Sequence, residues 1–166
     1  MIAADLAWRW TWKDFGAELL VPVSAGDILR GNRQPQGGVE RGGLLFADAS
    51  DSRGLILSRV SPPSPADKAH RHSIALNKER CVREIEEANR DGLRLIGFWH
   101  SHPEDVPDLS PVDITSFMAF SEKNRVDMPW PVAVIVGRDV GENGIRAWSI
   151  RPTKIYLAET TFSPSG

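Results

Sequence analysis

Two histidines and an aspartate are spaced in a way that suits a metal ion. The segment Gly97–Pro103 contains His100-Ser101-His102, and Asp113 follows after a short intervening stretch. Proteins build a catalytic zinc site from three nitrogen or oxygen ligands and leave one further position open. The joint pattern is more specific than either half alone, and it predicts that His100, His102 and Asp113 bind a metal.

The residues before the histidines predict the strand that positions them. Leu93–Trp99 is an apolar run that follows the polar Asn89–Gly92, and this is typical of a buried strand. Side chains alternate faces along a strand, so His100 and His102 are expected to point the same way. Pro103 has no N–H to give and ends the ladder. The two imidazoles should therefore lie at the carboxyl end of the strand, where a pocket can open.

Asp113 lies at the start of a predicted helix, and this leaves two readings of its role. In Ser110-Pro111-Val112-Asp113, a serine N-cap, a proline at the first helical position and an acid at the third are typical of a helix start. Taken alone, Ser110 and Asp113 are more often just a capping box. The loop Pro103–Leu109 is short enough to bring this first turn beside the strand end, which favours a metal ligand.

A hydrolytic zinc site also needs a general base that does not bind the metal. Most upstream acids lie in a polar helix predicted over Asn77–Asn89, where they form a solvated face. Glu40 differs, because it stands at the mouth of an apolar strand that begins with Gly42-Gly43. Glycines there permit close approach of another backbone or of a metal site. Glu40 is the candidate base.

Together, Glu40-Arg41-Gly42-Gly43, His100-Ser101-His102-Pro103, Ser110 and Asp113 resemble the motif of the JAB/JAMM metallopeptidases, also called the MPN domain. The resemblance implies one zinc ion per chain, held by His100, His102 and Asp113. It implies that Glu40 is the general base and that Ser110 hydrogen-bonds the developing oxyanion. It also implies a cytidine-deaminase-like α/β/α sandwich with a mixed sheet, as a single domain over residues 1–166 with a core of about 21–151.

Within this family, the chain resembles the compact bacterial type found beside E1-like and E2-like enzymes in antiphage systems. The implied function is an isopeptidase that releases the C-terminal tail of a conjugated protein, either a ubiquitin-like modifier or a cGAS-like nucleotidyltransferase. The implied partners are that tail, its conjugated target and the E1-like and E2-like enzymes of the same operon. Two alternatives stay open: processing of a ubiquitin-like or sulfur-carrier precursor at a linear peptide bond, and a non-catalytic scaffold.

Composition argues against several other classes of function. Hydrophobic residues make up 41% and charged residues 25%, which are values of a globular domain. The net charge is −2 with no basic block, so nucleic acid is not an expected partner. No apolar run is long enough to span a bilayer, and Met1–Asp5 does not resemble the start of a signal peptide. A lone cysteine, Cys81, favours the cytoplasm and excludes the Pro-Cys-x-x-Cys site of zinc deaminases.

Three further segments have predicted roles, and two of them have more than one reading. Trp8, Trp10 and Trp12 alternate, which predicts a strand whose aromatic face either packs in the core or docks a partner. The loop Pro62–Asn77 holds a second pair, His70-Arg71-His72, which is read as a solvated loop, a substrate contact or, less readily, a metal site. Ser58–Ser61 is a candidate edge for adding the substrate tail as a strand.

The remaining elements complete a mixed sheet with helices on both faces. The predicted elements are a short helix at Gly26–Arg30, strands at Gly43–Phe46, Gly54–Val60, Pro131–Val136 and Ile145–Ile150, an edge strand at Lys154–Leu157, and a frayed end at Thr160–Gly166.

Overall fold

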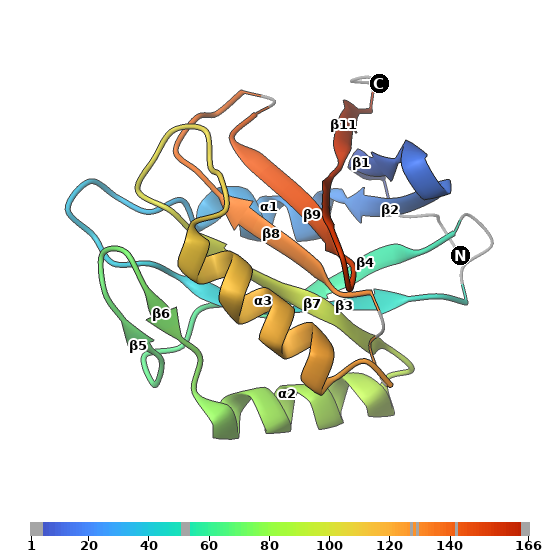
Figure 1. Cartoon of the computed structure of the whole chain (residues 1–166), viewed down its shortest axis with the longest axis horizontal. Coiled ribbons are helices and arrows are strands. Elements are labelled where there is room, and N and C mark those ends of the chain that lie inside the picture. The colour runs from blue at the N-terminus through green and yellow to red at the C-terminus, as the bar shows by residue number, and fades with distance from the viewer. Residues whose placement is uncertain (1–4, 51–53, 127, 129, 142, 164–166) are drawn as a thin grey trace.

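The computed structural model describes residues 5–50, 54–126, 128, 130–141 and 143–163, and these form one large mixed sheet with helices on both faces (Figure 1). The sheet has nine strands in the order β10-β9-β8-β7-β3-β4-β2-β1-β11 among the described residues. Its strands are β1 (Leu6–Trp12), β2 (Ala17–Pro22), β3 (Gly42–Asp48), β4 (Ile56–Val60), β7 (Arg94–Ser101), β8 (Val132–Val136), β9 (Ile145–Ile150), β10 (Ile155–Leu157) and β11 (Glu159–Phe162).

Three α-helices and a small hairpin complete the part of the chain that is described. They are α1 (Val23–Gly31), α2 (Lys78–Arg90), α3 (Pro111–Lys123) and the hairpin of β5 (Lys68–Ala69) and β6 (Ile74–Ala75); a 3-10 turn covers Lys13–Phe15. In Figure 1, α3 lies in front of the sheet, α2 runs along the bottom of the view and α1 lies behind the sheet. The α/β/α arrangement with a mixed sheet, predicted from the sequence, is confirmed. None of the described helices is long and apolar enough to cross a membrane.

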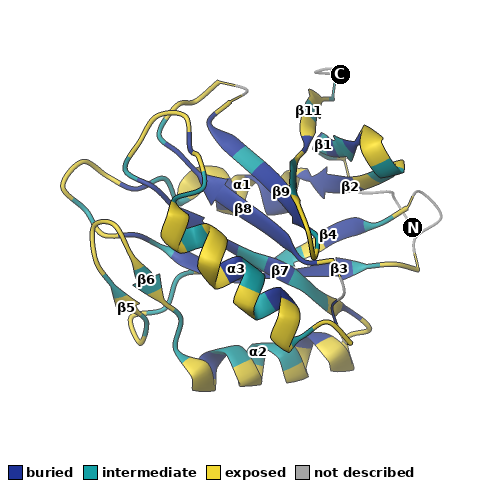
Figure 2. Ribbon diagram, in the orientation of Figure 1, coloured by how far each residue is buried: buried dark blue, intermediate teal, exposed yellow. Residues whose placement is uncertain are grey.

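The centre of the sheet is buried on both faces, and it carries the site. All of β8 is buried, and β3 is buried up to its last residue (Figure 2). Strand β7 runs antiparallel to β3 and parallel to β8, so that His100 lies opposite Gly42 on one side and Ile135 on the other. Gly97 allows β7 to approach β8 closely, because a Cβ there would lie 1.7 Å from the carbonyl oxygen of Val132.

The two long helices begin where the sequence predicts. The Asn77 side chain accepts a hydrogen bond from the backbone N–H of Arg80, which caps α2. At α3, Ser110 is the N-cap and Pro111 is the first helical residue, and Ser110 and Asp113 form a complete capping box. The helix predicted at Gly26–Arg30 is longer than expected and becomes α1.

The N-terminal tryptophans belong to the core. Trp8, Trp10 and Trp12 are all buried on one face of β1, so the strand is confirmed and the packing reading holds against the docking one.

The C-terminal end differs from its prediction. The expected frayed end, Thr160–Gly166, instead supplies most of β11, which pairs antiparallel with β1 and brings Phe162 opposite Trp8. This pairing satisfies backbone groups that β1 would otherwise leave open at the edge, and it adds a ring contact of 5.9 Å between Phe162 and Trp8. Residues 164–166 of the predicted frayed end lie outside the described part of the chain. Residues 1–4, which belong to the segment predicted not to be a signal peptide, lie outside it as well.

The prediction that Ser58–Ser61 forms an edge of the sheet is wrong. Most of this segment belongs to β4, which lies inside the sheet between β3 and β2. Among the described residues, β4 pairs with β2 at Ile56, opposite Leu20, and α1 also packs against β4. An interior strand offers no outer edge for a substrate tail.

Candidate metal centre

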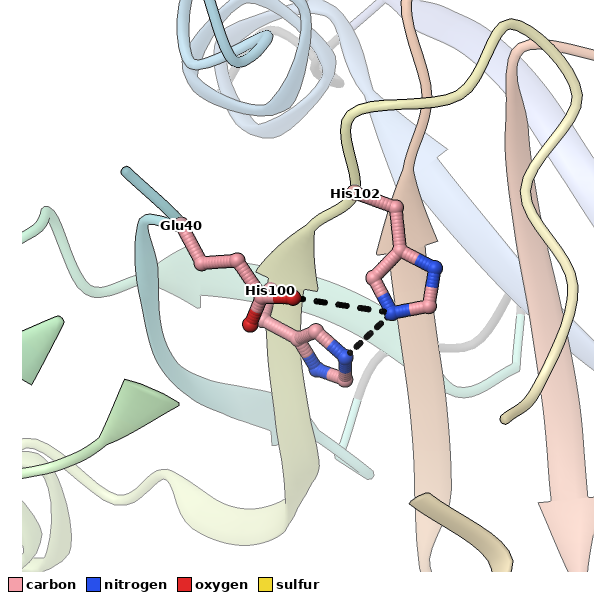
Figure 3. A group of neighbouring side chains, drawn as sticks. All are labelled: Glu40, His100 and His102. Carbon is pink, nitrogen blue, oxygen red and sulfur yellow. Dashed lines mark hydrogen bonds and ion pairs between the residues drawn. The ribbon is translucent and has the colours of Figure 1, made fainter. Parts of the chain in front are cut away.

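The two motif histidines converge at the carboxyl end of β7. The backbone N–H of His102 donates to the carbonyl oxygen of Val136 at 2.9 Å, so the pairing with β8 continues past Ser101. Both side chains are buried, and their Nε2 atoms lie 3.0 Å apart (Figure 3). The predicted same-face arrangement of His100 and His102 is what the structure has.

Asp113 completes this cluster from the first turn of α3. Its Oδ1 lies 3.3 Å from Nε2 of His100, and its Oδ2 lies 3.2 Å from Nε2 of His102. The same Oδ2 accepts a hydrogen bond of 2.9 Å from the backbone N–H of Ser110. Asp113 therefore both caps the helix and faces the imidazoles, so the capping reading and the ligand reading are compatible.

The spacing of these donor atoms fits a metal ion. With bonds of about 2.0–2.1 Å to nitrogen and oxygen, tetrahedral zinc holds its ligand atoms about 3.3 Å apart. The three distances among His100, His102 and Asp113 are 3.0, 3.3 and 3.2 Å. Two neutral imidazoles and one carboxylate are also donors that zinc accepts.

Glu40 approaches the same point from the residue pair before β3. It is buried, and its Oε1 lies 4.0 Å from Nε2 of His102 (Figure 3). Glu40, His100 and His102 form the metal-type cluster found among the described residues, and the exposed His70 and His72 are not part of it. Asp113 is nearer to the imidazoles than Glu40, so its carboxylate is the better-placed ligand and Glu40 stands farther out.

Burial and nearby charges give the carboxyl groups of Glu40 and Asp113 very different pKa values. Burial raises the pKa of Glu40 to about 7, with a further rise from Asp113 and an opposing effect of His102. Burial also opposes ionisation of Asp113, but hydrogen bonds from His100 and His102 outweigh it and hold the pKa of Asp113 well below its usual range. Asp113 is therefore an anion at neutral pH, whereas Glu40 can exchange a proton near neutrality.

The pKa values of the two imidazoles also differ. Burial lowers the pKa of His100. Burial acts in the same direction on His102, but hydrogen bonds to Asp113 and Glu104 outweigh it and raise the pKa of His102 to about 9. A ligand must be deprotonated to bind a metal, so a metal bound at Nε2 of His102 would displace a proton from this imidazole at neutral pH.

Glu104 is a residue of this site that the sequence reasoning missed. Its Oε1 lies 3.0 Å from Nδ1 of His102 and accepts a hydrogen bond of 3.0 Å from the backbone N–H of Asp108. A carboxylate on Nδ1 leaves the Nε2 lone pair free for a metal and fixes the orientation of the ring. The available signal was an acid just after the His-x-His-Pro segment.

Two cavities adjoin the cluster, and both include Ser110 and Glu40 in their walls. One, of about 400 Å³, lies over the loop after β7, and its lining also includes His72, His102 and Glu104. The other, of about 370 Å³, lies between α2, α3 and the sheet, and its apolar wall includes Leu44, Leu76, Ile85, Leu95, Phe98, Phe117 and Phe120. Ser110 Oγ accepts a hydrogen bond of 3.0 Å from the backbone N–H of Asp113, and its own hydrogen can still be donated.

Comparison with known proteins decides the family. A family described as prokaryotic homologs of the JAB domain matches residues 24–151. The chain belongs to this family. The resemblance drawn from the motif is thereby confirmed, and the cluster lies within the matched JAB domain.

Similar curated proteins include three named CD-NTase/cGAS isopeptidase. The chain is 31% identical to one from Pseudomonas aeruginosa (strain BWHPSA011 / Pa011) over 103 residues, which are 60% of this chain and 64% of the relative. It is 27% identical to one from Escherichia coli (strain TW11681), over 48% of this chain and 52% of the relative. It is 25% identical to one from Enterobacter hormaechei subsp. hoffmannii (strain UCI 50), over 76% of this chain and 64% of the relative. The matches thus span less than two thirds of the length of each relative.

A solved structure supports the fold of this JAB domain. The solution structure of protein DSY2949 from Desulfitobacterium hafniense superposes with a TM-score of 0.63 at 17% identity, and the match covers 82% of this chain and 87% of that one. At this level of identity the likeness shows the fold alone.

Proposed function

We propose that this JAB domain is a zinc-dependent isopeptidase that releases the C-terminal tail of a conjugated cGAS-like nucleotidyltransferase. The observation that carries the proposal is the convergence of Asp113 on the two Nε2 atoms at 3.3 and 3.2 Å, with buried Glu40 alongside. The names of the three relatives supply the class of substrate. The reaction reverses conjugation by E1-like and E2-like enzymes in antiphage defence, and the lone Cys81 suits a cytoplasmic location.

His100, His102 and Asp113 would hold one zinc ion per chain. When bound, zinc lowers the pKa of water toward about 7 and polarises a carbonyl oxygen. Glu104 keeps His102 in the tautomer that presents Nε2 to the ion, because it accepts from Nδ1.

Glu40 and Ser110 would carry the proton and the developing charge. Glu40 takes a proton from the attacking water and delivers it to the leaving lysine amine. In the metal-free protein, burial raises the pKa of Glu40 to about 7, and a carboxyl group that exchanges its proton near neutral pH is suited to act first as base and then as acid. Ser110 donates its hydroxyl hydrogen to the carbonyl oxygen as negative charge develops there, which contributes about 2–4 kcal/mol to such a transition state.

The two cavities give the substrate room on either side of the reacting groups. The apolar cavity of about 370 Å³ can take an apolar side chain close to the bond that is cut. His72 on the β5–β6 hairpin lines both cavities, which favours the substrate-contact reading of the His70–His72 segment.

The proposal is tested with two substrates that share one tail. The C-terminal tail of a cGAS-like synthase is joined to an acceptor protein through a lysine side chain in one and as a linear fusion in the other. We expect zinc-loaded protein to release the isopeptide-linked tail and chelator-treated protein to release none. No cleavage of either substrate by zinc-loaded protein would contradict the proposal, and faster cleavage of the linear fusion would favour precursor processing instead.

A serine variant tests the role of Ser110 against its role as a helix cap. Ser110→Ala is expected to lower kcat about 10²–10³-fold, as the loss of one oxyanion donor does. Asn77→Ala is the matched control, because it removes the side-chain cap of α2 and leaves the reacting groups intact. Equal effects of the two variants on kcat would mean that Ser110 acts only as a cap.

A further inference from the structure

Gln34 is a buried amide that joins three segments of the site. It lies between α1 and β3, and it is 2% exposed. Its Nε2 donates to the carbonyl oxygens of Gly38 and Arg71, each at 3.0 Å, and its Oε1 accepts from Ser101 Oγ at 3.3 Å. All the hydrogen-bonding atoms of this side chain are thus engaged, and by three different parts of the chain.

Two of these partners lie close in the sequence to residues of the candidate metal centre. Ser101 lies between His100 and His102, and Gly38 lies two residues before Glu40. Ser101 is also tied to the residue after the base: its Oγ accepts from the backbone N–H of Arg41 at 2.9 Å, and its own N–H donates to the Arg41 carbonyl at 2.8 Å. The backbone is therefore fixed by hydrogen bonds on both sides of Glu40, at Gly38 by Gln34 and at Arg41 by Ser101.

The third partner is the tip of the β5–β6 hairpin. The backbone N–H of Glu40 donates to the carbonyl oxygen of His70 at 2.7 Å, and Gln34 bonds the carbonyl of the next residue, Arg71. The hairpin has strands of only two residues each, and His70, Arg71 and His72 are exposed. Such a segment has few contacts of its own and opens easily. The Gln34 side chain provides an anchor that holds its tip against the backbone of Glu40.

We infer that Gln34 is a positioning residue, which fixes Glu40 relative to the metal-binding strand by holding Gly38, Ser101 and the hairpin tip together. The inference rests on the proposed function for the role of Glu40 but not for the hydrogen bonds. A proton-transfer group displaced by about 1 Å loses up to about 10²-fold in rate. Loosening Gln34 should therefore lower kcat without removing the metal.

Two variants separate the hydrogen bonds from the volume of the side chain. Gln34→Met keeps similar length and cannot hydrogen-bond, and Gln34→Glu keeps an acceptor for Ser101 but loses both donors. We expect both to keep zinc and to lower kcat at least about 10-fold with little change in KM. Ser149→Ala is the control, because Ser149 on β9 is also buried and accepts a hydrogen bond from Arg151. A kcat within about twofold of the parent for zinc-loaded Gln34→Met, as for Ser149→Ala, would overturn the inference.

Hydrogen exchange tests the same inference without using activity. In zinc-loaded protein, Gln34→Met should speed amide exchange of Glu40 and of the hairpin tip together, whereas Ser149→Ala should change neither. An unchanged Glu40 amide in Gln34→Met would refute the positioning role. If the parent cleaves no substrate, the proposed function fails, while the exchange result still decides whether Gln34 holds Glu40.

Discussion

The buried Arg80–Asp67 pair should be essential for stability, and its effect can be worked out from its contacts. Both side chains are 2% exposed, and Arg80 Nη2 lies 2.6 Å from Asp67 Oδ2. The guanidinium also donates to the carbonyl of Gly42 at 2.8 Å and to Ser61 Oγ at 3.2 Å. Arg80 thereby joins α2, the segment leading to the hairpin, and the start of β3 just beyond Glu40.

The substitution Arg80→Met removes the charge and the donors but keeps much of the volume. It leaves Asp67 buried without its partner, and breaking a buried pair in this way costs about 3–5 kcal/mol. For a chain of this size, each kcal/mol lowers Tm by about 2–4 °C, so a decrease of about 6–20 °C is expected. Arg59→Met is the matched control, because Arg59 and Asp91 form a pair of 2.7 Å whose side chains are 39% and 57% exposed. An exposed pair contributes about 0–1 kcal/mol.

The pH dependence of this effect has a definite sign. Burial alone would raise the pKa of Asp67, but hydrogen bonds from Arg80 outweigh it and hold that pKa below its usual value. A depressed folded-state pKa stabilises the protein above the unfolded pKa of about 4, and this stabilisation is lost as the pH falls below it. Urea unfolding of the parent, Arg80→Met and Arg59→Met at pH 7 and at about pH 3.5 measures both effects. A cost for Arg80→Met at pH 7 no larger than that for Arg59→Met would refute the reasoning.

Three further predictions concern the site and the strand beneath it. Glu104→Ala should weaken zinc affinity about 10–100-fold with all ligands present, because it frees Nδ1 of His102; competition with a chelator measures this, and unchanged affinity would exclude the role. Gly97→Ala should prevent correct pairing of β7 with β8, since its Cβ would meet the Val132 carbonyl at 1.7 Å; native-like Tm in this variant would contradict the register. In metal-free protein, the pKa of Glu40 is raised to about 7 by burial, so its ionisation destabilises the fold as the pH rises from about 4.5 through 7. Glu40→Gln should then have a higher Tm than the parent at pH 8 but not at pH 4, and a lower Tm at pH 8 would show that the carboxylate is not destabilised there.

The elements that carry His100, His102 and Asp113 could be predicted from the sequence because their signals are local. Alternation along a strand places His100 and His102 on one face, and a capping box places Asp113 in the first turn of a helix. Buried central strands such as β8 are recognisable as apolar runs. Each of these features depends on residues only a few positions apart.

The features that the sequence did not reveal depend on distant pairing. Gln34 has an ordinary polar neighbourhood in the chain, and its importance arises from contacts with Arg71 and Ser101 that only the folded sheet creates. The pairing of β11 with β1 brings Phe162 opposite Trp8 from the other end of the chain, and a short polar segment gives no sign of it. The interior position of β4 follows from strand order, which local periodicity does not determine.

The division of roles between Asp113 and Glu40 is the central claim, and one paired measurement tests it most directly. Zinc content and tail cleavage are measured on the same samples of the parent, Glu40→Gln and Asp113→Ala. We predict about one zinc ion per chain in the parent and in Glu40→Gln, with cleavage lost in the latter, and loss of both zinc and cleavage in Asp113→Ala. Zinc lost from Glu40→Gln but retained in Asp113→Ala would contradict the account, because Glu40 would then be the ligand.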